Sequence, residues 1–411
     1  MKPQAAFKPL KALAEALGEL LDRATPLAGT DAVTTFEADG RVLARDAVSS
    51  LQVPPNDNSS MDGYAVRRAD VAAAGVVLPV SQRIAAGSAG TPLQPGTAAR
   101  IFTGAPIPEG ADAVLMQEDC EALDDGSVRI NLVPHAGQWI RRAGEDITRG
   151  AVVLSAGTRL APAELGLAAS IGLHQLQVAR RPRVALFSTG DELVMPGDVP
   201  PEQMRPGAIY NSNRFFLRAM LLRLGCEVTD LGIVPDRRDA TIEALQRASE
   251  AHDLILTSGG VSVGEEDHIK PAVESLGTLD LWQIAMKPGK PFAYGRVGKA
   301  HFMGLPGNPV SSFLTFALLV RPFLLRLQGV QAVAPRALPA TAHFTWARAD
   351  KRREFLRVRH NAAGGLDLFS NQSSGVLTSA AWSDGVVDNP AGQTIAPGDT
   401  VQFIAFAELL G

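Results

Sequence analysis

Cysteine is scarce in this sequence. The 411-residue chain contains only Cys120 and Cys226. Two thiols cannot by themselves form a disulfide framework or a zinc cluster. This excludes the small disulfide-stabilised secreted domains and is typical of a protein from a reducing cytoplasm.

Long uninterrupted apolar runs are also missing. The longest run, residues 313–325, contains Arg321 and Pro322, and a membrane-spanning helix needs about 20 mainly apolar residues. Lys11, Glu15 and Glu19 interrupt any secretory signal core near the start. We therefore expect a soluble cytoplasmic protein without a membrane partner. The formal net charge of −4 argues against a general nucleic-acid binder.

Several common catalytic signatures are absent. The sequence has no GxxxxGK[ST] phosphate loop and no GxGxxG fingerprint opening a helix. Ser258 and Ser262 lie in SGGVS, which is not a GxSxG nucleophile elbow, and the seven histidines are scattered. These absences favour a site that positions phosphates and a metal over covalent catalysis.

Strands and helices alternate between residues 183 and 326. Apolar runs predict strands at 184–187, 226–231, 254–256 and 301–303, and helical spacing predicts helices at 213–224, 239–252, 267–276 and 313–326. This order indicates a mostly parallel α/β sheet. Short β-like runs between 76 and 142, and again from 340 to 404, predict two small β domains. Further helices are expected at 9–21 and 158–171.

Polar turns follow the predicted strands of the α/β segment. They are STGDE at 188–192, SGGVSVGEED at 258–267, KPGK at 287–290 and GLPGNP at 304–309. Turns at the carboxyl ends of parallel strands can converge on one edge of the sheet. Glycines and free amides there hold anions, and the carboxylates of Glu265, Glu266 and Asp267 suggest Mg²⁺.

The KPGK turn places Lys287 and Lys290 three residues apart. Together with the hydroxyl of Ser311 or Ser312, these ammonium groups suit a tetrahedral oxyanion. A lone KPGK sequence is more typical of a solvated turn than of a binding site. Its combination with the other three turns favours a binding site.

Three polar stretches of the first 150 residues leave two interpretations open. PNDNSSMDGYAVR at 55–67 is either a polar loop or a site in which Asp62 holds a substrate group or a metal-bound water. Thr103-Gly104 is either an ordinary strand end or an anion-contacting turn. RRAGED at 141–146 is either a solvated charge cluster or a pair of arginines facing a phosphate.

Seven motifs, in this order, resemble the MoeA family of molybdopterin molybdenumtransferases, which is related to the E domains of gephyrin and its plant counterpart. They are NSSMDGYA at 58–65, TGAP at 103–106, RAGED at 142–146, STGDE at 188–192, the stretch 258–267, KPGKP at 287–291 and GLPGNPVSS at 304–312. The resemblance covers nearly the whole chain.

The resemblance implies a multidomain α/β plus β fold in an elongated homodimer. Its expected parts are a discontinuous dimerisation domain at 1–52 and 145–180, an inserted β-rich domain at 53–144, a mostly parallel MogA/MoaB-like α/β domain at 181–329 and a small C-terminal β-barrel at 330–411. The implied reaction inserts molybdate into adenylylated molybdopterin with Mg²⁺-dependent release of AMP. The pterin supplies the dithiolene sulfurs, so no cysteine ligand is needed.

Family roles carry over to individual positions. The implied catalytic residues are Asp62, Glu192, Asp236 and Asp267, the last three also as Mg²⁺ ligands; the implied binding residues are Thr103, Asp146, Ser258, Gly259, Lys287, Lys290, Pro306, Ser311, Arg357 and Ser374. A neighbouring subunit is expected to supply Asp62, Thr103 and Asp146. Gln283 departs from the family, which often has lysine there.

Two other functions remain open. The α/β segment also resembles the molybdopterin adenylyltransferase of the same pathway, and this enzyme and other cofactor-pathway proteins are expected partners. The gephyrin relative suggests a dimeric scaffold for a partner peptide. The additional domains and the Lys287–Lys290 turn favour insertion over adenylylation, and retention of the acidic residues argues against a scaffold.

Overall fold

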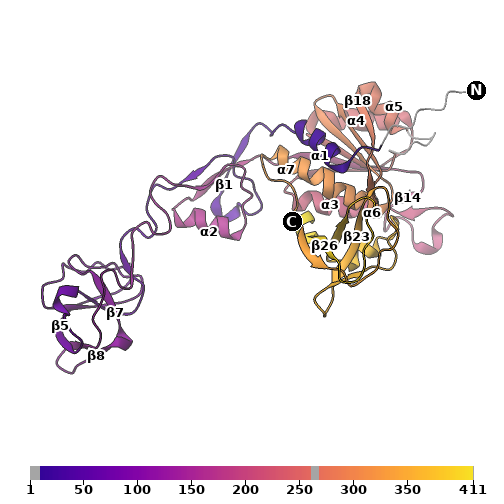
Figure 1. The fold of residues 1–411 in the computed structure, drawn as a ribbon. Helices are drawn as coiled ribbons and strands as arrows, with labels where there is room; N and C mark the ends of the chain where they lie inside the picture. Colours follow the sequence, from indigo (N-terminus) through magenta and orange to yellow (C-terminus); the bar gives the residue numbers. More distant parts are fainter. Residues whose placement is uncertain (1–9, 261–267, 411) are drawn as a thin grey trace, which may run out of the picture.

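The computed structural model describes residues 10–260 and 268–410. The molecule is elongated (Figure 1), with the α/β sheet and the C-terminal sheet together at one end and a separate β-rich unit at the other. A narrow segment of paired strands connects the two ends.

The α/β sheet has the strand order β16-β13-β17-β21-β20-β18. Its parallel strands are β16 (Glu227–Val234), β13 (Arg183–Thr189), β17 (Leu254–Ser258) and β21 (Ala300–Leu305). Its helices are α3 (Ser212–Arg223), α4 (Arg238–Ala251) and α5 (Ile269–Leu276). The prediction of a mostly parallel sheet is confirmed. Two antiparallel strands were not predicted: β20 (Pro291–Val297), which pairs with β21, and β18 (Gly277–Gln283), which pairs with β20 at the edge of the sheet.

The apolar stretch Pro309–Leu327 is one continuous helix in three parts. These are α6 (Pro309–Thr315), a π-helical turn η5 (Phe316–Val320) and α7 (Arg321–Leu327). Pro322 has no N–H to donate to the carbonyl of Leu318, and the wider π turn accommodates that gap. The helix has the length and hydropathy of a membrane span, but 94% of it is buried inside the structure, as in the core helix of a soluble protein.

The N-terminal segment pairs with residues far along the chain. α1 (Leu13–Asp22) packs near α7, β1 (Thr30–Thr34) pairs with β12 (Gln175–Ala179), and β2 (Ala47–Val48) pairs with β11 (Val152–Leu154). α2 (Pro162–Ser170) begins at Pro162, where a missing N–H costs nothing. A bridge between Val53 and Ile147 closes the segment between them, so the β-rich unit is an insertion.

The inserted sheet has the order β7-β4-β6-β5-β9-β8. Its strands are β4 (Gly63–Val66), β5 (Val76–Ile84), β6 (Ala98–Ile101), β7 (Ala113–Met116), β8 (Cys120–Ala122) and β9 (Ser127–Ile130), and β3 (Asn58–Ser59) pairs with β10 (Ile140–Arg141) beside it. Our limits for the four domains stay a prediction, because strand pairing alone does not fix them.

The C-terminal sheet has the order β19-β23-β25-β26-β22, with β24 paired to β23. The bounds are β19 (Met286–Lys287), β22 (Leu338–Thr341), β23 (Arg353–His360), β24 (Leu366–Leu368), β25 (Gly385–Asn389), β26 (Thr400–Ala405), α8 (Thr378–Trp382) and α9 (Phe406–Leu410). The KPGK turn lies in the α/β unit as expected, between β18 and β20. β19, which leads into the turn, also pairs with β23 of the C-terminal sheet.

His301 on β21 makes the stability of the fold depend on pH. The side chain is 8% exposed, and the guanidinium of Arg296 lies 3.1 Å from its Nε2. Burial, followed by the Arg296 charge, lowers the pKa of His301 to about 4, compared with about 6.5 in an unfolded chain. Between these values the unfolded state binds more protons, so the fold loses up to about 3 kcal/mol as the pH falls from 6.5 to 4.

We expect His301→Gln to remove this acid sensitivity. At pH 7 the variant unfolds at a lower temperature than the wild type, because the packed ring is lost. The gap between the two thermal midpoints narrows as the pH falls to 4, since only the wild type has an imidazole that gains a proton on unfolding. A gap that stays constant over this pH range would show that His301 titrates normally.

Candidate active site

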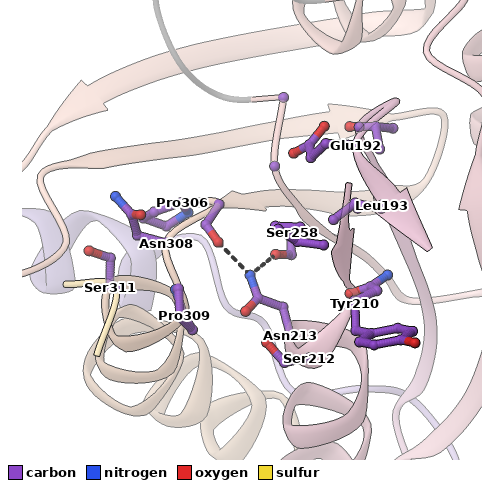
Figure 2. Close-up of a pocket in the computed structure, with 18 of the residues that line it drawn as sticks. Glu192, Leu193, Tyr210, Ser212, Asn213, Ser258, Pro306, Asn308, Pro309 and Ser311 are labelled. Atoms are coloured by element: carbon purple, nitrogen blue, oxygen red, sulfur yellow. Dashed lines mark hydrogen bonds between the residues drawn. The ribbon is translucent and has the colours of Figure 1, made fainter. Parts of the chain in front are cut away.

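A cavity of about 800 Å³ lies at the carboxyl ends of β13, β17 and β21 (Figure 2). The turns after these three strands all contribute to its wall, as expected for parallel strands that end at one edge. The predicted site residues among its lining residues are Glu192, Asp236, Ser258, Gly259, Pro306 and Ser311.

Asn213 joins two of these turns. It lies in the first turn of α3, is 8% exposed, and donates from Nδ2 to Ser258 Oγ and to the carbonyl of Gly307, both at 2.7 Å. Figure 2 shows both hydrogen bonds converging on the one amide. Asn211 caps the helix by accepting from the backbone N–H of Arg214. We did not predict Asn213. It could have been recognised as the one polar residue on a helix face whose other buried residues are apolar.

Two glycines allow the turns to pack closely. Gly259 has φ of +93°, and a side chain there would meet the carbonyl oxygen of Thr189 at 2.8 Å. Gly190 has φ of +145°, and a side chain there would meet the Glu192 carboxylate at 2.6 Å. Because both conformations are strained for other residues, the cavity wall depends on glycine at these positions.

Two carboxylates come from different loops to the same cavity. Glu192 follows β13 and Asp236 follows β16. Asp267, the third predicted ligand, lies outside the described residues, as do Glu265 and Glu266. Within residues 10–260 and 268–410, no group of three His, Cys, Asp or Glu side chains could hold a metal. Two carboxylates nevertheless fit Mg²⁺, which usually completes its shell with water and substrate phosphates.

A second cavity of about 320 Å³ contains the KPGK turn. Its wall includes four of the predicted residues, namely Lys287, Lys290, Ser311 and Ser374. It shares Pro291, Asn308 and Ser311 with the first cavity, so the two adjoin along the start of α6. The backbone N–H of Val310 donates to the carbonyl of Ser374 at 2.9 Å, which fixes the C-terminal loop against this helix.

Arg357 does not line either cavity. It is 1% exposed, and its guanidinium donates to Ser379 Oγ at 3.1 Å, to the carbonyl of Phe355 at 3.0 Å and to the carbonyl of Ser373 at 3.4 Å. Burial lowers the pKa of Arg357 to about 10. In this structure Arg357 therefore supports the loop that carries Ser374, and its contact with an oxyanion stays a prediction.

Asp62 and Thr103 form a pair in the inserted unit. The Thr103 backbone N–H and hydroxyl donate to Asp62 Oδ1 at 2.8 and 2.7 Å, and these bonds hold the pKa of Asp62 below its usual range. The unit lies at the opposite end of the molecule from the cavities (Figure 1). The exposed Asp146 lies where the chain returns from that unit. One chain therefore does not bring these three residues to the cavities.

Comparisons with known proteins match this architecture. Family models match the MoeA N-terminal region, domains I and II, at residues 11–172, a probable molybdopterin-binding domain at 185–326 and the MoeA C-terminal region, domain IV, at 339–406. The solved structure of a molybdopterin biosynthesis MoeA protein from Pyrococcus horikoshii is 28% identical and superposes with a TM-score of 0.83, covering 97% of this chain and all of that one.

Curated relatives agree over nearly the full length. The molybdopterin molybdenumtransferase of Haemophilus influenzae is 40% identical, covering 97% of this chain and 99% of the relative. Molybdopterin molybdenumtransferase 2 of Mycobacterium tuberculosis is 39% identical, covering 87% and 90%. With the three-part match and the cavity at the sheet edge, these likenesses show that the chain belongs to the MoeA family of molybdopterin molybdenumtransferases.

Proposed function

We propose that this protein inserts molybdate into adenylylated molybdopterin and releases AMP, giving the molybdenum cofactor. The observation that carries the proposal is the adjoining pair of cavities. One contains the carboxylates of Glu192 and Asp236, and the other contains the ammonium groups of Lys287 and Lys290. A substrate with phosphates and a separate tetrahedral oxyanion needs two such neighbouring environments.

The chain's own residues supply positioning and electrostatics. In the first cavity, the turns at Gly190 and Gly259 admit a phosphate chain close to the backbone. Asn213 fixes the turn after β17 to the turn after β21. In the second, Lys290 and Ser311 offer an ammonium and a hydroxyl to molybdate. Mg²⁺ held by Glu192 and Asp236, with Asp267 as a third predicted ligand, would neutralise charge on the phosphates.

The proposal includes a cytoplasmic homodimer in which the inserted unit of one subunit completes the cleft of the other. The separation of Asp62 and Thr103 from the cavities within one chain supports this arrangement. Asp62 and Thr103 are exposed and already hydrogen-bonded to each other, so they can contact a substrate bound in the cavity of the other subunit.

Mixed dimers test the shared cleft. We expect Asp62→Asn and Asp236→Asn to be inactive alone, and the purified mixed dimers to have about half of wild-type activity, because each mixed dimer holds one intact cleft out of two. The measurement is AMP release by the co-purified, differently tagged subunits. Complete inactivity of the mixed dimers would place both carboxylates in the same subunit's site.

The proposed reaction is tested by measuring AMP from adenylylated molybdopterin while Mg²⁺ and molybdate are omitted in turn. We expect AMP only when both are present. Tight binding of the adenylylated pterin without AMP release would instead indicate a scaffold. Adenylylation of free molybdopterin by ATP would indicate the neighbouring pathway reaction.

A further inference from the structure

Lys287 of the KPGK turn and the nearby Arg352 both contact the carboxylate of Asp350. Asp350 accepts from Arg352 Nε at 3.0 Å through Oδ1 and from Arg352 Nη2 at 2.9 Å through Oδ2. Lys287 Nζ lies 3.3 Å from the same Oδ2. The bonds to Arg352, followed by the nearby charges, hold the pKa of Asp350 far below its usual range. Asp350 is therefore a permanent anion between two cations.

These cations border the proposed oxyanion site. Lys287 and Arg352 both line the 320 Å³ cavity with Ser311 and Ser374. Arg352 also lines an adjoining cavity of about 500 Å³, whose wall includes Asp350 itself. An anion in the smaller cavity would therefore meet a guanidinium and an ammonium group that Asp350 already contacts.

A second carboxylate near Lys287 has a different role. Glu354 is 1% exposed, and its two oxygens accept from Lys287 Nζ at 3.0 Å and from Trp346 Nε1 at 2.7 Å. Glu354 also pairs with Lys287 in the β19–β23 register. With both oxygens used and no access to solvent, Glu354 fixes Lys287 to the C-terminal sheet.

Asp350 differs from Glu354 in its access to solvent and its place in the fold. Its side chain is 19% exposed, compared with 1% for Glu354, and it lies in the loop before β23 and not within a strand. Water reaches the Asp350 carboxylate and can solvate its charge when it separates from Arg352, which is not possible for the buried Glu354. Asp350 is therefore the carboxylate that an incoming oxyanion can displace.

Among the described residues, Lys290 differs from Lys287 and Arg352 because it does not contact Asp350. The Lys290 side chain lines both the 320 and the 500 Å³ cavities. No hydrogen bond or ion pair of its ammonium occurs among the residues that the structure describes. Lys290 can meet an entering oxyanion at once, whereas Lys287 and Arg352 become available only when Asp350 gives way.

We infer that Asp350 sets the affinity of the site for a tetrahedral dianion by competing with it for Arg352 and Lys287. This inference deepens the proposed function and rests on it, because it takes molybdate as the dianion. Competition of this kind weakens binding of the oxyanion, and it also allows the bound oxyanion to leave for the pterin sulfurs.

The test is equilibrium binding of sodium molybdate to the full-length protein by calorimetry. We expect Asp350→Asn to bind molybdate about threefold more tightly or better, because the amide keeps the acceptor for the Arg352 N–H but removes the competing charge. In Asp350→Asn/Arg352→Gln the gain should be lost, because the freed guanidinium is absent. Sulfate, a dianion of the same shape, should follow the same order.

Asp388→Asn is the matched control. Asp388 also accepts from an arginine through both oxygens, but its partner Arg353 lines neither cavity, so molybdate affinity should not change. Unchanged or weaker binding by correctly folded Asp350→Asn would overturn the inference and show that Asp350 orients the cations for the anion. Wild-type protein that binds no molybdate would overturn the proposed function and this inference together.

Discussion

Glu192→Gln is expected to slow AMP release by about 100-fold at saturating substrate. The carboxylate lines the 800 Å³ cavity, is solvent-exposed, and has no hydrogen bond or ion pair within residues 10–260 and 268–410. A carboxylate at the strand ends that lines the cavity and has no protein partner among the described residues is available to a substrate or a metal ion. The amide keeps the shape of the side chain and removes only the charge.

Asp191→Asn is the control for Glu192→Gln. Asp191 is the adjacent exposed acid of the same turn but does not line the cavity, so its variant should keep wild-type turnover. Both variants should unfold at the wild-type temperature, because neither removes a buried contact. Equal turnover by Glu192→Gln and the wild type would remove this carboxylate from the proposed chemistry and leave the cavity without one of its two acidic groups.

Asn213→Ala is expected to have the second large effect, on both stability and activity. The change removes two hydrogen bonds of 2.7 Å and leaves the Gly307 carbonyl without this donor. We expect a loss of about 2–3 kcal/mol in the unfolding free energy of the α/β unit. The Michaelis constant for the adenylylated pterin should rise about tenfold or more, because the turns after β17 and β21 are no longer held at a fixed separation.

Ser258→Ala is the graded control for Asn213→Ala. It removes one partner of the amide but keeps the bond to Gly307, so we expect roughly half the loss of stability. Hydrogen exchange of the α3 and β17 amides reports the stability of this unit without assuming that the whole chain unfolds in one step. Faster exchange in Asn213→Ala with an unchanged Michaelis constant would make the amide purely structural.

Much of the α/β unit is predictable because apolar spacing reports burial directly. The run at 184–187 and the spacing at 213–224 correspond to β13 and α3 within a few residues. The convergence of the polar turns also follows, since parallel strands end at one edge. What periodicity does not report is which strand pairs with which.

Other features of the fold could not be predicted from local sequence. β19 precedes the KPGK turn as expected, but it also pairs with β23 of the C-terminal sheet, and nothing local to Met286–Lys287 encodes this partner. β25 (Gly385–Asn389) is buried along its whole length, so it shows no alternation of apolar and polar residues. Arg357 was expected to contact an oxyanion, yet its side chain is buried within β23.

Some site residues could be located from the sequence, and others could not. Residues in turns after parallel strands, such as Glu192 and Ser258, could be located because the turn itself is the signal. Asn213 and Asp350 act through contacts with residues distant in sequence or in neighbouring loops, which only the fold brings together. Asp62 and Thr103 were expected at the cleft of a neighbouring subunit, and their hydrogen bond to each other was not predicted.

The most direct test of the central claim counts two products in one reaction. Purified protein is given adenylylated molybdopterin, Mg²⁺ and molybdate, and AMP and pterin-bound molybdenum are quantified in the same sample over time. The account predicts that one molybdenum appears on the pterin for each AMP released, and neither without molybdate. AMP release at the same rate without molybdate, or with no molybdenum on the pterin, would contradict it.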